Sequence, residues 1–212
     1  AQMVDIICTG NPARKTVNVK IREGMEVEDI AELLVEEGIL DSTEEFLSLC
    51  RSGEAFSEYS FVNSILQSAD KDQRKYALEG YLFPDTYEVY ADASAKSVIT
   101  KMLIRFNEIF SDEYMDRAQE LNMTVDQAVT MASMIEREAK TADFDKVSAV
   151  FHNRLNSGMK LQSDAPLKYI LDAGNTLDYT SDQMAVNSPY NTYNIDGLPI
   201  GPICNPSAAA IK

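Results

Sequence analysis

The chain has 212 residues, of which 45% are hydrophobic and 25% are charged, a composition typical of globular proteins that argues against low-complexity disorder. Its 34 acidic and 19 basic residues give a net charge of −15. This charge makes nucleic acid an unfavourable partner and provides no attraction to an anionic membrane surface.

The amino-terminal part predicts a strand followed by two helices. Residues 16–21 (TVNVKI) alternate apolar and polar side chains, the pattern of a half-buried strand. A helix is then indicated by apolar residues at helical spacing and by a glycine at its end, namely Val27, Ile30, Ala31, Leu34 and Gly38. Ser42 and Glu45 have the spacing of a capping box for the second helix. Residues 76–81 are the candidate for a closing strand, which would complete a βααβ unit.

A segment rich in aromatic residues, with a glycine and a Pro-Asp turn, follows this unit. It reads EGYLFPDTY over residues 79–87, and we place a domain boundary at its start. The predicted domains are residues 1–78 and residues 79–212, and the predicted fold class is α+β with a helix-rich second domain.

Periodicity predicts several helices in the second domain. Residues 98–121 fit one long amphipathic helix or a helix pair. Thr124 and Gln127 form a capping-box pattern that opens a helix to about Lys140. Further helices are predicted at 145–155 and 165–171, followed by proline-rich loops and, at residues 206–212, by the start of another helix.

The cysteine and histidine content indicates no metal site. Cys8, Cys50 and Cys204 are far apart and lack a CxxC spacing, so we expect isolated apolar side chains. His152 is the single histidine, which argues against a zinc enzyme and against a Ser/His/Asp triad. We therefore expect no metal site.

Glu136 is the candidate catalytic residue. It lies at the edge of the apolar stripe of the helix predicted from Thr124, beside the small side chains of Val129 and Ala132. Desolvation at such an edge would raise the pKa of the carboxyl, as a general acid for glycosidic bonds requires. The alternative is a structural ion pair with Lys140, four residues on. Glu138 lies about 160° away around the helix and cannot share the site.

A glycosidase that uses two carboxylates needs a partner acid, for which Asp164 and Glu79 are the candidates. Amide and aromatic side chains that suit sugars surround these motifs. The predicted substrate-binding residues are Glu79, Asn153, Gln162, Asp164, Tyr190, Asn191 and Tyr193.

Five stretches together resemble the MltG-type (YceG-like) endolytic murein transglycosylases, from about Thr16 to Lys212. They are LEGYLFPDTY (78–87), ASMIEREA (132–139), VFHNRLNSGMKLQSD (150–164), SPYNTY (188–193) and GLPIGPICNP (197–206). The sequence departs from the usual pattern at Ile200 and Ser207, where members usually have proline and glycine, and at His152. Members usually also continue beyond the position of Lys212.

The resemblance implies a LysM-like amino-terminal subdomain and a catalytic domain whose essential glutamate, the first of a Glu-x-Glu, is Glu136. It implies cleavage inside peptidoglycan strands between N-acetylmuramic acid and N-acetylglucosamine, leaving 1,6-anhydro ends, by a reaction that needs no metal and no cofactor. It also implies an anchor ahead of this chain in the cell membrane, with the catalytic domain outside the cytoplasm, and wall-synthesis enzymes as partners. The alternatives are a non-catalytic peptidoglycan-binding protein, a hydrolytic muramidase and an acidic structural domain.

Overall fold

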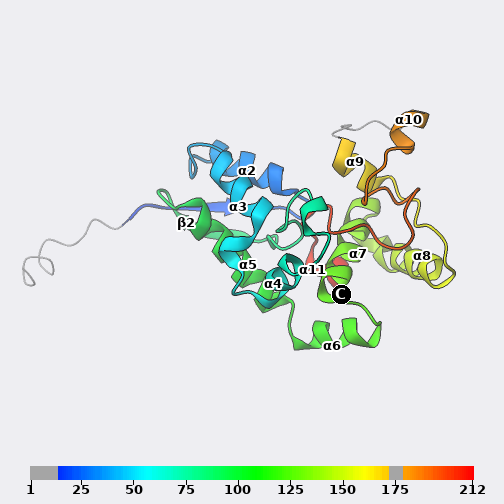
Figure 1. Cartoon of the computed structure of the whole chain (residues 1–212). Coiled ribbons are helices and arrows are strands. Elements are labelled where there is room, and N and C mark those ends of the chain that lie inside the picture. The colour runs from blue at the N-terminus through cyan, green and yellow to red at the C-terminus, as the bar shows by residue number, and fades with distance from the viewer. Residues whose placement is uncertain (1–13, 172–178) are drawn as a thin grey trace, which may run out of the picture.

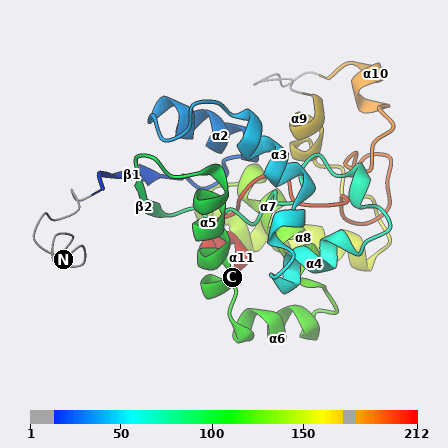
Figure 2. The same cartoon turned by 60° about the vertical axis from the view of Figure 1, so that its left-hand side comes forward.

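The computed structural model describes residues 14–171 and 179–212 and has an α+β fold that is mainly helical. Its sheet has two antiparallel strands, β1 (Thr16–Lys20) and β2 (Thr86–Tyr90), in which Val17 lies opposite Val89 and Val19 opposite Tyr87. Figures 1 and 2 show this sheet with α2 and α3 at one end of the molecule, α8 to α10 toward the other, and α7 between them. Cys8 lies outside the described residues.

The first predicted strand is confirmed, but the closing strand is not where the sequence placed it. Residues 76–81 are buried throughout and form turns, and β2 closes the unit instead. The backbone N–H groups of Ala77 and Leu78 donate to the carbonyls of Arg51 and Cys50 at the end of α3. Because these groups satisfy a helix end, which otherwise leaves its last carbonyls unpaired, they are not available to β1.

The two helices of the predicted βααβ unit are α2 (Val27–Glu36) and α3 (Glu44–Ser52). The apolar stripe predicted for α2 is buried, and Gly38 follows the C-cap residue Glu37. The capping box expected from Ser42 and Glu45 is wrong, because α3 begins after Thr43 and no side chain caps it. Short elements follow: the 3₁₀ helix η1 (Glu54–Phe56), α4 (Ser60–Leu66) and η2 (Lys71–Gln73).

The later helices agree closely with their predicted positions. Residues 98–121 form a pair, α5 (Ala95–Ile109) and α6 (Asp112–Glu120). They are followed by α7 (Val125–Glu138), η3 (Thr141–Asp143), α8 (Phe144–Asn156) and α9 (Ala165–Leu171). The last two described helices are α10 (Ser181–Met184), which was not predicted, and α11 (Ala208–Ile211). Within the described ranges, no helix combines the length and apolarity needed to cross a bilayer.

Helix α7 belongs to both hydrophobic clusters of the molecule. Val129 packs in a first cluster that extends from Val19 through the helices α2 to α5. Met131 packs in a second cluster that also contains residues of α8, α9 and α11. The segment at which we placed the domain boundary packs inside the first cluster through Leu78, Tyr81 and Leu82. The division into residues 1–78 and 79–212 stays a prediction.

Candidate active site around Glu136

Helix α7 presents Glu136 near its carboxyl end. The helix is started by the predicted capping box, in which the Thr124 hydroxyl accepts from the Gln127 N–H at 3.1 Å and the Gln127 side chain accepts from the Thr124 N–H at 2.9 Å. Ala132 and Ile135 are buried, and Glu136 is half-buried at the edge of their stripe, as predicted. The position of Glu136 thus follows from the capping signal and the helical period together.

Ser207 holds one oxygen of the Glu136 carboxylate. The Ser207 backbone N–H and hydroxyl both donate to Oε2, at 2.9 and 2.6 Å. The Oε1 atom accepts no hydrogen bond from any described residue. The Gly24 turn packs alongside, since a Cβ atom on Gly24 would lie 3.7 Å from Cγ of Glu136. The carboxylate is therefore fixed on one side and free on the other.

The ion pair with Lys140 that we considered as the alternative is not formed between the described positions of the two residues. The basic neighbour that takes part in the site is Arg137. It is exposed, but its Nη1 donates to the Gly24 carbonyl at 3.1 Å and its Nη2 lies 3.5 Å from Glu26 Oε1. Burial raises the pKa of Glu26 to about 7, although the nearby positive charge of Arg137 opposes this rise.

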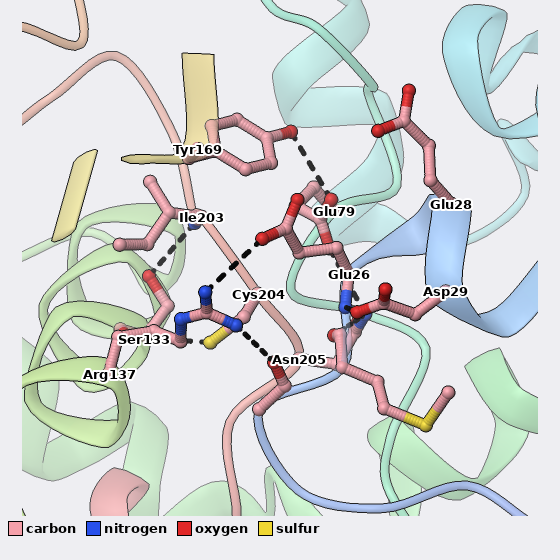
Figure 3. A network of polar contacts seen from close by, with 12 residues as sticks. Glu26, Glu28, Asp29, Glu79, Ser133, Arg137, Tyr169, Ile203, Cys204 and Asn205 are labelled. Carbon is pink, nitrogen blue, oxygen red and sulfur yellow. Dashed lines mark hydrogen bonds and ion pairs between the residues drawn. The ribbon is translucent and has the colours of Figure 1, made fainter. Parts of the chain in front are cut away.

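Glu79 lies under the surface, with only 1% of its area exposed. Its Oε2 accepts from the Val27 N–H and the Tyr169 hydroxyl, both at 3.2 Å, and its Oε1 accepts from Asn205 Nδ2 at 3.1 Å. Burial raises the pKa of Glu79 to about 8. Figure 3 shows Glu79 directed toward Tyr169 and Asn205, with Glu26 and Arg137 beside them.

Three of the predicted substrate-binding residues gather on the Glu138 side of α7. Tyr193 donates to Asp164 Oδ1 at 2.7 Å, and Ser163 donates to Glu138 Oε2 at 2.9 Å. Gln162 accepts a hydrogen bond from Arg154 and has a φ of 53°, a backbone conformation that non-glycine residues rarely adopt and that is found at functional sites. A hollow of about 260 Å³ is lined in part by Glu138, Arg154, Gln162 and Ser163.

The other predicted binding residues have different surroundings. Asn153 is exposed on α8. Asn191 is fully buried and donates to the carbonyls of Met184 and Val186, which shapes its own loop. Tyr190 is 2% exposed and packs against the ring of Tyr169 at 5.3 Å, and its burial raises its pKa to about 12. Direct contact of Asn153, Tyr190 and Asn191 with a substrate stays a prediction.

Sequence reasoning missed Glu26, Asn205 and the contact made by Ser207. Glu26 is the N-cap residue of α2, in the part of the chain that we treated as a separate unit. Asn205 appeared only as part of a loop and Ser207 only as part of the helix start predicted at residues 206–212, and the single signal was the departure from the resembled pattern at Ser207. The two cysteines within the described residues, Cys50 and Cys204, are buried free thiols, as expected for isolated apolar side chains.

Comparison with known proteins gives consistent matches. The model of the YceG-like family matches residues 1–212. The endolytic murein transglycosylase of Streptococcus pneumoniae serotype 2 is 36% identical over 164 residues, which are 75% of this chain and 29% of that protein. The endolytic murein transglycosylase of Bacillus subtilis (strain 168) is 35% identical over 147 residues, 68% of this chain and 40% of that protein. This chain thus spans less than half the length of these relatives.

A solved structure also matches. The crystal structure of a putative yceG-like protein from Listeria monocytogenes superposes with a TM-score of 0.77 at 30% sequence identity. The match covers 99% of this chain and 69% of that one.

Proposed function

This chain belongs to the YceG-like family, and on that premise we propose that it is an endolytic lytic transglycosylase. It cleaves the bond between N-acetylmuramic acid and N-acetylglucosamine inside peptidoglycan strands and leaves 1,6-anhydro ends. The relatives at 35–36% identity are named endolytic murein transglycosylases, which supports the substrate and the reaction class.

One observation carries the assignment of Glu136 as the catalytic residue. Ser207 directs two donors at Oε2, while Oε1 has no partner within the described chain. A single acid that first gives and then takes a proton needs one oxygen that can reach the substrate and a carboxylate that does not rotate. The contact with Ser207 meets both needs.

The reaction uses the free oxygen of Glu136 twice. Its proton passes to the bridging oxygen, and the bond between that oxygen and C1 of the muramic acid breaks, so that positive charge develops at C1. The ionised Glu136 then takes the proton of the 6-hydroxyl of the same sugar as O6 bonds to C1. Atoms and charges balance with one carboxylate, and no second catalytic acid takes part.

Groups on the Glu138 side of α7 supply binding in this proposal, at a part of the strand away from the bond that Glu136 cleaves. Asp164, Tyr193 and Gln162 offer hydrogen bonds and a flat face beside the hollow lined by Glu138, a mixture that suits sugar rings. The βααβ unit is LysM-like and extends the grip on the glycan. We place the protein at the outer face of the cell membrane, held by an anchor, near wall-synthesis enzymes whose nascent strands it terminates.

The test is mass spectrometry of the products formed from purified peptidoglycan by this chain, by Glu136→Gln and by the control Glu120→Gln, an exposed change on α6. We expect anhydro-muropeptides from the native chain and the control, and none from Glu136→Gln. Equal products from Glu136→Gln would reject Glu136 as the acid. Binding to insoluble peptidoglycan without cleavage by the native chain would favour a non-catalytic binding protein.

A hydrolytic muramidase is the second candidate, favoured by one observation. Glu26 places a further carboxylate beside Arg137, the residue that follows Glu136, and burial raises its pKa to about 7. Such a group can act as a base toward water, as the second carboxylate of a hydrolase does. Reducing ends in the products, in place of anhydro ends, would identify this reaction.

A further inference from the structure

We propose that Glu79 and Asn205 form a buried positioning pair that fixes the segment 203–207 and thereby orients the carboxylate of Glu136. This inference rests on the proposed function. It adds Asn205 to the site and gives Glu79, which the sequence suggested as a substrate-binding residue or partner acid, a positioning role without contact to the substrate. Figure 3 shows both residues within the same network.

Glu79 connects three separate parts of the chain. Its donors are the first N–H group of α2, the Tyr169 hydroxyl of α9 and the side-chain amide of Asn205. Because Glu79 is only 1% exposed, these three donors are held together by their shared acceptor and do not exchange it for solvent. A buried acceptor that receives three protein hydrogen bonds holds the segments that carry its donors in fixed positions.

Asn205 can bind Glu79 in only one orientation of its amide. Its Oδ1 accepts from the Leu82 N–H at 2.8 Å, so Nδ2 must face the other way. There Nδ2 donates to the Met25 carbonyl at 3.0 Å and to Glu79 at 3.1 Å. A flipped amide would turn its NH₂ group toward the Leu82 N–H and its oxygen toward the Met25 carbonyl and Glu79. It would therefore lose all three hydrogen bonds.

The backbone of Asn205 also pairs with the turn that packs on Glu136. Its N–H donates to the Met25 carbonyl and its carbonyl accepts from the Gly24 N–H, both at 2.9 Å. Asn205 therefore couples Glu79 to the Gly24 turn, which lies against Cγ of Glu136.

The segment that contains Asn205 contacts α7 on both sides of this residue. Before it, the Ile203 N–H donates to the Ser133 hydroxyl at 3.1 Å. After it, Ser207 donates twice to Glu136. If Asn205 moves, the donors that set the direction of the Glu136 carboxylate move with it. A displacement of about 1 Å at a reacting group can lower the rate about 100-fold.

The test compares Glu79→Gln with a matched buried change, Met102→Ala in α5, which leaves the polar network intact. Both readouts are taken above about pH 8, where Glu79 is ionised and offers two acceptors. Gln offers one acceptor and one donor, so its NH₂ group opposes either the Asn205 donor or the donors of Val27 and Tyr169. Asn205→Asp is a second, nearly isosteric variant. It replaces the donor that faces Glu79 and Met25 with an oxygen.

The first readout is independent of catalysis. Amide hydrogen exchange measured by NMR should show Ile203, Asn205 and Ser207 protected in the native chain and in Met102→Ala. We expect the protection of Asn205 and Ser207 to fall at least about 10-fold in Glu79→Gln and in Asn205→Asp. Unchanged protection in both variants would overturn the positioning pair, whatever the activity.

The second readout separates positioning from binding and from loss of stability. On peptidoglycan, at equal folded protein, we expect kcat to fall about 10- to 100-fold in Glu79→Gln with KM nearly unchanged, and to stay near native in Met102→Ala. A rise in KM alone, or an equal fall in Met102→Ala, would overturn the inference. If the native chain is protected but cleaves no peptidoglycan, and both network variants lose protection, the proposed function is rejected and the positioning pair is retained.

Discussion

Ser207 and Glu136 meet through a single carboxylate oxygen, which receives both the backbone N–H and the hydroxyl of the serine. The same hydroxyl accepts from the Ala210 N–H at 3.2 Å and so caps α11. One side chain thus orients the candidate catalytic group and starts the helix that packs on α7. Relatives that carry glycine at this position would keep the N–H contact and lack the hydroxyl contact.

Ser207→Ala should lower kcat about 10-fold with little change in KM, because it removes one hydrogen bond to a charged group and keeps the backbone donor. Loss of the helix cap should cost about 1 kcal/mol of unfolding free energy. Steady-state kinetics on peptidoglycan and urea unfolding measure the two effects. Ser207→Thr keeps a hydroxyl and is the control, and a native kcat in Ser207→Ala would show that the N–H contact suffices.

Tyr193→Phe should raise KM about 10-fold and leave kcat within about two-fold, because its hydroxyl is assigned to binding and not to proton transfer. The change also removes the 2.7 Å hydrogen bond to Asp164, which frees that carboxylate to rotate. Steady-state kinetics on peptidoglycan fragments measure kcat and KM separately. Tyr114→Phe on α6 is the control, and a fall in kcat alone would place Tyr193 in the chemical step.

Local signals in the sequence were sufficient to predict those elements whose structure is decided by residues close together along the chain. The capping box at Thr124, the stripe of α7 and the helix 165–171 depend on residues a few positions apart, and all are found where expected. The position of Glu136 at a half-buried edge follows from the same periodicity.

Contacts between distant segments could not be predicted. The closing strand was misplaced because Ala77 and Leu78 are satisfied by the end of α3, a contact that no periodicity signals. The role of Asn205 depends on Glu79 and Met25, which are 126 and 180 positions away. A fully buried polar residue in a proline-rich loop has the sequence pattern of an ordinary turn. The network around Asn205 is therefore visible only in the folded structure.

Gly80→Ala should strongly destabilise the fold. Gly80 has a φ of 89°, and an added Cβ would lie 2.5 Å from Cβ of Pro202 and 2.9 Å from Cγ1 of Val129. We expect a loss of about 3 kcal/mol or more, since both the backbone conformation and the packing oppose a side chain. Thermal and urea unfolding would measure it.

The matched control is Gly158→Ala, where φ is also positive, at 65°, but nothing lies within 4 Å of the added atom. It carries the backbone cost alone, about 1 kcal/mol. Equal losses in the two variants would show that the approach of Pro202 and Val129 to Gly80 does not matter.

Glu26→Gln should change the pH dependence of stability. The pKa of Glu26 is about 7 in the folded chain against 4.5 for the free group, so the folded state binds more protons between these values. The contribution of Glu26 is therefore fully present below about pH 4.5 and is lost as pH rises to about 7, by at most about 1.4 kcal/mol per pH unit.

Urea unfolding of the native chain and of Glu26→Gln across pH 4.5 to 8 measures this effect. The charged groups that act on Glu26 are Arg137, Lys75, Asp29 and Glu28, and Glu26 in turn raises the pKa of Glu79; all five are retained in the variant. Native stability minus variant stability should decrease as pH rises. Glu32→Gln on the exposed face of α2 is the control, for which the difference should stay flat. A flat difference for Glu26→Gln as well would contradict its raised pKa.

Thr124→Ala should lower the unfolding free energy by about 1 kcal/mol, because it removes the cap of α7 and leaves the Gln127 N–H without its partner. Thr100→Ala is the matched control, since the Thr100 hydroxyl bonds within α5 to the Lys96 carbonyl and caps nothing. There we expect a change within about 0.5 kcal/mol. Since Glu136 lies at the far end of α7, the folded fraction of Thr124→Ala should cleave peptidoglycan at the native kcat. A fall in that kcat would mean that the start of α7, and not only the contact with Ser207, sets the direction of the Glu136 carboxylate.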